Sequence, residues 1–221
     1  MNRGYHEIKE HGKREFPFNI YPCSIPVDFS HVALHWHEEM EIIAVKKGKG
    51  RITVDTVSYP VEEGDILAVF PGQLHAISCG NGERMEYENI IFRLSMLMGD
   101  NGDGCTVHFL KPLQEGQAKN PVLIQRNQPD HEVFGKVIQE LDRFSEIRGN
   151  GYQLAVKGQL FLFLYYAYGR GILFTEKKPG HAREKIKGIL EYIREHFGEE
   201  ITIRQAAELC FYSESHFMKY F

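Results

Sequence analysis

Two histidines and a glutamate occur at positions 35, 37 and 41, and this spacing constrains the fold more than any other feature of the sequence. On an extended strand, residues separated by even numbers lie on the same face. The side chains of His35, His37 and Glu41 are therefore predicted to converge. Two imidazoles and one carboxylate form a ligand set that divalent transition metals favour, and they leave a coordination position open.

A second stretch adds a fourth candidate ligand. Residues 64–75 contain Gly64, an apolar run, the turn Pro71-Gly72 and then His75. The two stretches resemble the two signature motifs of the cupin superfamily. The first motif matches at every fixed position, whereas in the second the proline lies directly before Gly72 instead of two positions before it. The resemblance implies a small β-barrel of the double-stranded β-helix or jelly-roll type.

Two interpretations of these four residues remain open. In the first, His35, His37, Glu41 and His75 hold a divalent transition metal such as Zn, Ni, Fe or Mn. In the second, they line the mouth of the barrel and bind an organic effector, a sugar or a similar small molecule, or one another. A barrel of this kind can enclose one small ligand. Trp36 has the opposite parity and is predicted to pack outside the pocket.

Short strands and turns are predicted between residues 31 and 110. The expected strands cover residues 41–46, 51–57, 59–61, 66–70, 75–78, 87–94 and 106–110. Residues 47–50 should end the first of them, and Asn81-Gly82 should form a hairpin turn. Residues 1–15 are interpreted as a flexible arm, and residues 16–22 as an irregular edge segment that could cover the pocket. The first domain, mainly β, is expected to span residues 1–125.

The period of the apolar residues then changes to that of helices, and residues 126–180 are expected to form an all-α linker. Apolar residues from Val133 to Phe144 recur at steps of three and four, and Asp130 could cap this helix. A second helix over residues 152–168 is apolar nearly all round. We expect one of its faces to meet a second subunit in a homodimer.

The last segment, residues 181–221, is predicted to be helical again. Apolar residues from Ile186 to Phe197 share one face, Thr202 caps a short helix over residues 203–209, and Ser213 caps another. This order of elements is a helix-turn-helix pattern. The stretch resembles the beginning of the DNA-binding domain of AraC-type transcription regulators, which place a cupin-like sensor before a helical linker and two helix-turn-helix units.

The resemblance implies DNA contacts in a longer parent protein, because the sequence stops inside what would be the first recognition helix. The implied DNA-facing residues are Glu214, Ser215, His216, Met218 and Lys219, whereas Phe217 and Phe221 belong to the buried side. Residues 181–221 carry six Lys or Arg and seven Asp or Glu, a net charge of 6 − 7 = −1. Since phosphate contacts supply most non-specific affinity, this stretch alone is not expected to bind DNA.

The expected function is the sensor part of a sequence-specific transcription regulator, not an enzyme. The alternative is a metal-dependent cupin enzyme, a dioxygenase or an isomerase. The four cysteines form no CxxC pair, no signal peptide is visible, and no apolar run approaches the roughly 18 residues of a membrane span, so a cytoplasmic protein without a membrane partner is expected.

Overall fold

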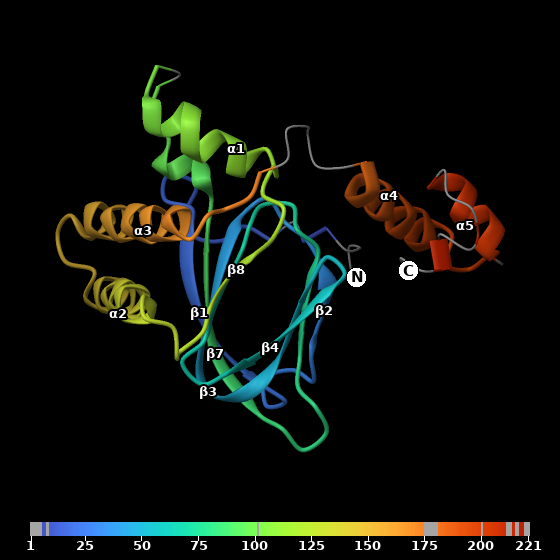
Figure 1. Cartoon of the computed structure of the whole chain (residues 1–221), viewed down its shortest axis with the longest axis horizontal. Coiled ribbons are helices and arrows are strands. Elements are labelled where there is room, and N and C mark those ends of the chain that lie inside the picture. The colour runs from blue at the N-terminus through green and yellow to red at the C-terminus, as the bar shows by residue number, and fades with distance from the viewer. Residues whose placement is uncertain are drawn as a thin grey trace.

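Eight antiparallel strands build two sheets that face each other (Figure 1). The computed structural model describes residues 6–7, 9–100, 102–174, 181–199, 201–210, 214 and 217–218, without the side chains of residues 181–186. The strands are β1 (Phe18–Ile25), β2 (Val32–His35), β3 (Met40–Val54), β4 (Val57–Glu62), β5 (Ile66–Val69), β6 (His75–Ser78), β7 (Met85–Phe92) and β8 (Val122–Ile124).

Strand β3 belongs to both sheets. Its first half pairs with β5 and β7, in the sheet ordered β1-β7-β3-β5-β8, and its second half pairs with β4 and β6. Strand β2 pairs with β6 in the second sheet. The chain is thus mainly β in its first part, as the sequence predicts, and helices follow.

Apolar side chains fill the space between the sheets and also cover the outer face of the five-stranded sheet. The inner cluster consists of Ile25, Ile43, Val45, Ile52, Val54, Val61, Leu67, Val69, Ile77, Met85 and Tyr87. The outer cluster joins alternate residues of the same strands, such as Ile42 and Ala68, to the helices. Burial on both faces explains why β5 is an uninterrupted apolar run.

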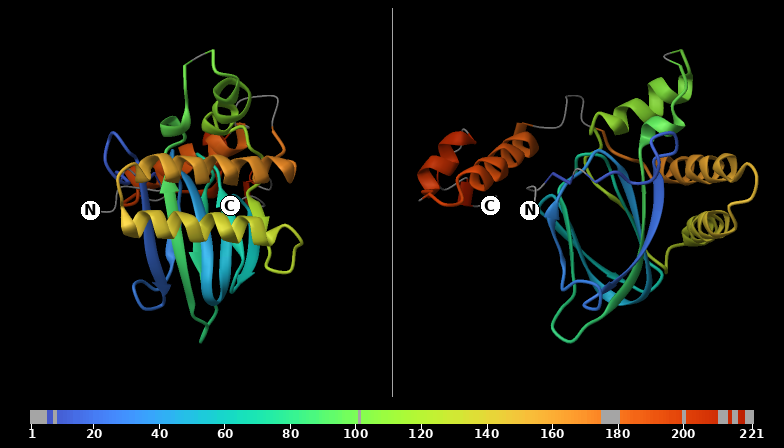
Figure 2. Two further views of the ribbon diagram at one scale, coloured as in Figure 1. Left: turned by 90° about the vertical axis from the view of Figure 1, so that its left-hand side faces the viewer. Right: turned by 180° about the vertical axis from the view of Figure 1, so that it is seen from behind.

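Two long helices form the layer over that outer face (Figure 2). They are α2 (His131–Ile147) and α3 (Tyr152–Gly169), close to their predicted bounds. Asp130 precedes α2, but its side chain makes no capping hydrogen bond. Its carboxylate instead accepts two hydrogen bonds from Arg170 Nη1, at 2.7 and 2.6 Å, which ties the start of α2 to the end of α3.

The prediction that residues 47–50 end a strand is wrong. Strand β3 runs through them, with an irregular register between Val45 and Lys47 and with Gly48 at a φ of +80°. A Cβ atom at Gly48 would lie 2.0 Å from the carbonyl oxygen of Arg84. The glycine therefore permits a bend and a close approach of β7, and it does not end the strand.

The predicted hairpin at Asn81-Gly82 is also wrong, and so is the irregularity, though not the edge position, predicted for residues 16–22. The turn joins β6 to β7, which lie in different sheets, because each pairs with a different half of β3. Residues 18–25 form the regular strand β1, which pairs with β7 along its whole length. Pro22 is tolerated there because β1 is the edge strand of its sheet.

Residues 106–110, predicted to be a strand, form a π-helical turn, η2 (Thr106–Leu110), that leads into α1 (Lys111–Gln114). Asp103 Oδ2 accepts hydrogen bonds from Thr106 N at 2.8 Å and Thr106 Oγ1 at 2.7 Å, as a helix cap does. The alternating apolar residues Val107 and Phe109 are exposed, so no sheet buries them. A short 3₁₀ helix, η1 (Leu94–Leu97), precedes this segment.

The last helices, α4 (His181–Glu195) and α5 (Ile203–Leu209), lie on the side of the barrel opposite α2 and α3 (Figures 1 and 2). Thr202 caps α5 with a full capping box, which confirms the prediction. Phe197, predicted to share the apolar face of this helix, is 86% exposed because α4 ends two residues before it. The predicted cap at Ser213 lies outside the described residues.

Candidate functional site

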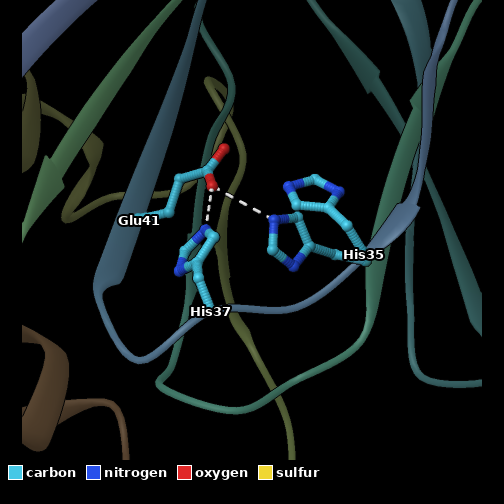
Figure 3. Close-up of side chains that lie close together, drawn as sticks. His35, His37 and Glu41 are labelled. Atoms are coloured by element: carbon cyan, nitrogen blue, oxygen red, sulfur yellow. Dashed lines mark hydrogen bonds and ion pairs between the residues drawn. The ribbon is translucent and has the colours of Figure 1, made fainter. Parts of the chain in front are cut away.

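The structure brings all four candidate ligands together at one end of the barrel. His35 ends β2, His75 begins β6 directly opposite it, and Glu41 lies near the start of β3. One ligand atom from each of these residues and from His37 lies within 4.8 Å of all the others. Figure 3 shows the rings of His35 and His37 and the carboxylate of Glu41 turned toward a common point.

The side chains of His35, His37 and Glu41 converge for a different reason than the single extended strand expected from their spacing. His35, His37 and Glu41 do not share one strand, because β2 ends at His35 and β3 begins only at Met40. His37 lies in the turn between the two strands. The turn brings His37 and the β3 carboxylate back toward His35, so the spacing predicted that these side chains lie together but not the backbone geometry that brings them there.

Each of the three histidines is oriented by a backbone carbonyl. His35 Nδ1 lies 2.9 Å from the oxygen of Ala33, His37 Nδ1 lies 3.1 Å from that of Glu39, and His75 Nδ1 lies 3.0 Å from that of Gln73. A carbonyl oxygen only accepts hydrogen bonds, so Nδ1 is the protonated nitrogen in all three rings. The Nε2 atoms are therefore the ones left to bind a metal or a second proton.

Two of these Nε2 atoms face one oxygen of Glu41. His37 Nε2 lies 2.9 Å and His75 Nε2 lies 3.1 Å from Glu41 Oε2, and all three side chains are buried. Burial alone would raise the pKa of Glu41, but the charges and hydrogen bonds of His75 and His37 hold it well below its usual range. Burial alone would lower the pKa of His37, and the bond to Glu41 outweighs it, so that this pKa is raised.

His35 stands apart from this carboxylate. Burial, and then the proximity of His75, lower the pKa of His35 to about 4, so its ring is neutral near pH 7. Its Nε2 lies 3.5 Å from Glu7 Oε2, a carboxylate supplied by the N-terminal arm. The arm thus contacts the same nitrogen that His35 would offer to a metal.

Part of the predicted flexible arm packs over the cluster. His11 is only 4% exposed, and its ring centre lies 6.2 Å from that of His37. Its Nδ1 is 3.2 Å from the hydroxyl of Tyr21, and burial lowers its pKa. Glu7 and His11 were missed from the sequence because no motif or spacing connects the arm to the barrel.

Glu39 is a further residue that the sequence did not single out. Its side chain is buried, with Oε1 accepting a hydrogen bond from Arg93 Nε at 2.7 Å and Oε2 lying 3.8 Å from His37 Nδ1. Because its backbone carbonyl also orients His37, Glu39 supports the ring from two sides. The sequence offers only the pair Glu38-Glu39, which gives no sign of which carboxylate is buried.

The donor set fits a divalent metal chemically. With every Nδ1 donating to a carbonyl, the Nε2 atoms of His37 and His75 reach Glu41 Oε2 at hydrogen-bond distance only with a proton between them, and a divalent cation can take the place of such a proton. The second carboxylate oxygen, Oε1, is buried and accepts no hydrogen bond from the part of the chain that the structure describes. Three imidazoles and one carboxylate suit Zn, Fe and Ni, and also Mn.

The implied DNA-facing residues are described only in part. Glu214 is exposed and Met218 is 60% exposed, whereas Phe217 is 6% exposed, as predicted for the buried side of the last helix. Ser215, His216, Lys219 and Phe221 lie outside the described residues. Phe217 packs with Ile189, Ala206, Ala207 and Cys210.

Comparison with known families matches one model to residues 26–164, that of the AraC-like ligand binding domain. The chain belongs to this family. The match begins directly after β1 and runs through most of α3. It includes the four clustered residues and covers more than half of the 221 residues.

Two curated relatives come from Bacillus subtilis strain 168. The uncharacterized HTH-type transcriptional regulator YdeC is 20% identical over 223 residues, which cover 100% of this chain and 76% of the relative. The uncharacterized HTH-type transcriptional regulator YbfI is 25% identical over 193 residues, or 85% of this chain. The aligned region spans 64% of YbfI.

Similar solved structures include ToxT from Vibrio cholerae, with a TM-score of 0.43 and 15% identity over 94% of this chain and 74% of that one. A cupin 2 conserved barrel domain protein from Salinispora arenicola matches with a TM-score of 0.33 and 22% identity over 36% of this chain and 66% of that one. Among the described helices, none has the length and apolar character that crossing a membrane requires.

Proposed function

We propose that this chain is the sensor part of a transcription regulator whose barrel binds a divalent transition metal through His35, His37, Glu41 and His75. The observation that carries the proposal is the common orientation of the three rings. Each donates Nδ1–H to a carbonyl, so three Nε2 atoms remain for a metal beside a buried carboxylate. The naming of both curated relatives as transcriptional regulators supports the regulatory role.

The packing inside the barrel favours a metal over an organic effector as the ligand of the cluster. Eleven buried apolar or aromatic side chains occupy the space between the sheets. A sugar-sized effector in that space would have to displace them, whereas an ion needs only the room between the four ligand atoms. A small-molecule effector, a sugar or a similar compound, would then approach from the mouth, where the arm lies.

The residues around the cluster have separable roles in this proposal. Three imidazoles and Glu41 hold the metal, and the carbonyls of Ala33, Glu39 and Gln73 orient the rings. The pair Glu39–Arg93 keeps the turn that carries His37 in place. The bound metal supplies a fixed positive charge, and the low pKa of Glu41 means that its carboxylate is already ionised to meet that charge.

Elemental analysis by mass spectrometry of protein purified without added metal tests the proposal. Wild type should contain about one transition-metal ion per chain, and His37→Ala and Glu41→Gln should contain almost none, because each removes one ligand from a single site. His108→Ala is a matched control, since His108 is exposed and is not one of the four clustered residues. Wild type without metal, or Glu41→Gln with a full complement, would contradict the metal assignment.

We further propose that the protein acts as a homodimer and binds DNA through the helices of its C-terminal part. Helix α3 supports the dimer, because apolar side chains remain exposed on it, namely Leu154, Phe161, Leu162 and Tyr165. The capped helix α5 and the exposed side chains of Glu214 and Met218 support the DNA contact. Since residues 181–221 carry a net charge of −1, the stretch by itself is not expected to bind DNA measurably.

A further inference from the structure

Trp36 lies between the first two ligand residues in the sequence, and its indole ring contacts two other parts of the chain, the N-terminal arm and helix α4. Its indole ring stacks on the ring of His6, with centres 4.0 Å apart and planes 7° apart. The ammonium nitrogen of Lys187, in α4, lies 3.6 Å from the centre of the same indole ring. A cation over an aromatic face at this distance is attractive.

The contacts of the arm and of α4 extend to the backbone of the cluster. Glu7 N donates to the carbonyl of Trp36 at 2.9 Å, and Gly72 N donates to the carbonyl of His37 at 2.8 Å. A Cβ atom at Gly72 would lie 3.2 Å from Lys187 Nζ. Lys187 therefore lies close to both Trp36 and Gly72, which belong to the two chain segments that border the cluster. Lys187, Trp36, Gly72 and Arg93 line a cavity of about 360 Å³.

His35 connects these contacts to metal binding. In the arrangement described here, His35 Nε2 lies against Glu7 Oε2, whereas His37 and His75 lie against Glu41. Ligand atoms lie about 2.1 Å from a bound zinc ion, so all four must gather closely around it. Moving His35 Nε2 from Glu7 toward Glu41 pulls on the next residue, Trp36, which His6 and Lys187 hold.

We propose that Trp36 couples metal loading of the cluster to the position of α4 through its contact with Lys187. The inference rests on the proposed metal site and adds the route by which the C-terminal helices sense it. Lys187 stabilises the position of Trp36 that keeps His35 on Glu7. By thermodynamic linkage, metal binding then weakens the contact with α4, and loss of that contact strengthens metal binding by the same factor.

The test is the Zn²⁺ affinity of purified variants, measured by competition with a chromophoric chelator. Lys187→Met keeps the length of the side chain without its charge and should bind Zn²⁺ about five-fold more tightly or better, the lower range of typical couplings. Lys187→Arg keeps a cation over the ring and should stay near wild type. Arg194→Met removes a charge elsewhere on α4 and is the matched control.

A double-mutant cycle makes the test specific for the pair. Trp36→Leu also removes the stacking on His6, so it should raise the Zn²⁺ affinity at least as much as Lys187→Met does. Adding Lys187→Met to Trp36→Leu should give no further gain, because the indole ring that Lys187 contacts is already absent. Trp36 is the only tryptophan of the chain, so its fluorescence reports the contact directly. Zn²⁺ should change the tryptophan emission of wild type and should change that of Lys187→Met much less. Because Zn²⁺ has a filled d shell, the ion itself does not quench this fluorescence.

The outcomes separate this inference from the proposed function. Wild type that binds Zn²⁺ with the same affinity as Lys187→Met, or more tightly, would overturn the coupling and leave the metal site standing. Additive effects of Trp36→Leu and Lys187→Met would also overturn it. Wild type that binds no Zn²⁺, and behaves as His37→Ala does, would overturn the metal site and the coupling together.

Discussion

At the scale of single residues, the decisive feature is which nitrogen of each histidine carries hydrogen. The identity of the four clustered residues could be predicted from spacing, because the pattern of His35, His37 and Glu41 is local in sequence. The orientation of the rings could not, because the carbonyls of Ala33, Glu39 and Gln73 reach the Nδ1 atoms only after the backbone has folded. Glu7 and His11 were unpredictable for the same reason.

Cys23 allows a prediction about protonation on the barrel wall. It is half-buried, and burial raises the pKa of its thiol to about 11. Only the thiolate reacts with iodoacetamide, so at pH 8 Cys23 should be alkylated about 100-fold more slowly than an ordinary free thiol of pKa about 8.5. Its rate should rise with each pH unit up to about pH 11.

Peptide mapping by mass spectrometry across this pH range measures that rate. The exposed Cys105 provides the internal reference in the same sample. Unfolding in urea should make the two cysteines react alike, since the effect comes from burial. Rapid alkylation of Cys23 at pH 8 in the folded protein would show that this part of the barrel is open to solvent.

At the scale of elements, β3 shows where sequence reasoning succeeded and failed. The apolar residues of its first half and the alternation of its second half correctly predicted extended structure in both halves. The residues between them looked like a turn, because Gly48 and Gly50 flank a lysine. What kept the strand continuous was its pairing with β7 as far as Gly48 and with β4 from Lys49 onward; β7 is distant in the sequence, and no local pattern reveals that pairing.

Gly48 is the position where this bend can be tested. Gly48→Ala should lower the free energy of unfolding by about 2 kcal/mol or more, since alanine is strained at positive φ and its Cβ meets the Arg84 carbonyl. Urea denaturation measures the change. Gly135→Ala, inside α2 with its nearest contact at 3.8 Å, should instead stabilise by about 0.5–1 kcal/mol.

At the scale of the whole molecule, the barrel separates two helical parts. Helices α2 and α3 cover one side, and α4 and α5 lie on the other (Figure 2). The order of these parts could be predicted from the change of apolar period along the chain. The contact of Lys187 with Trp36 could not, because it joins residues 151 positions apart through one side chain on each.

The exposed apolar side chains of α3 predict that the protein forms a dimer through this helix. Leu154 and Tyr165 are 77% and 71% exposed and lie eleven residues, about three turns, apart on the helix. Sedimentation equilibrium should show a dimer for wild type and a monomer for Leu154→Glu combined with Tyr165→Glu, because charges at an apolar interface are costly.

Phe197→Glu is the control for that experiment, since Phe197 is an exposed apolar residue outside α3 and its replacement should leave the dimer intact. A monomeric wild type at micromolar concentration would contradict the proposed dimer. Dissociation caused by Phe197→Glu alone would place the contact between subunits in the C-terminal part instead.

The sharing of β3 by both sheets also affects the rates at which a metal ion would bind to and dissociate from the proposed site. Neither sheet can open at β3 without disturbing the other, so Glu41 belongs to a segment whose opening approaches global unfolding. His35 ends a strand of four residues with an irregular register, and it faces the arm. Release of an ion should therefore begin at His35, and the residence time of the ion should follow the local opening of β2 and the arm rather than the stability of the barrel.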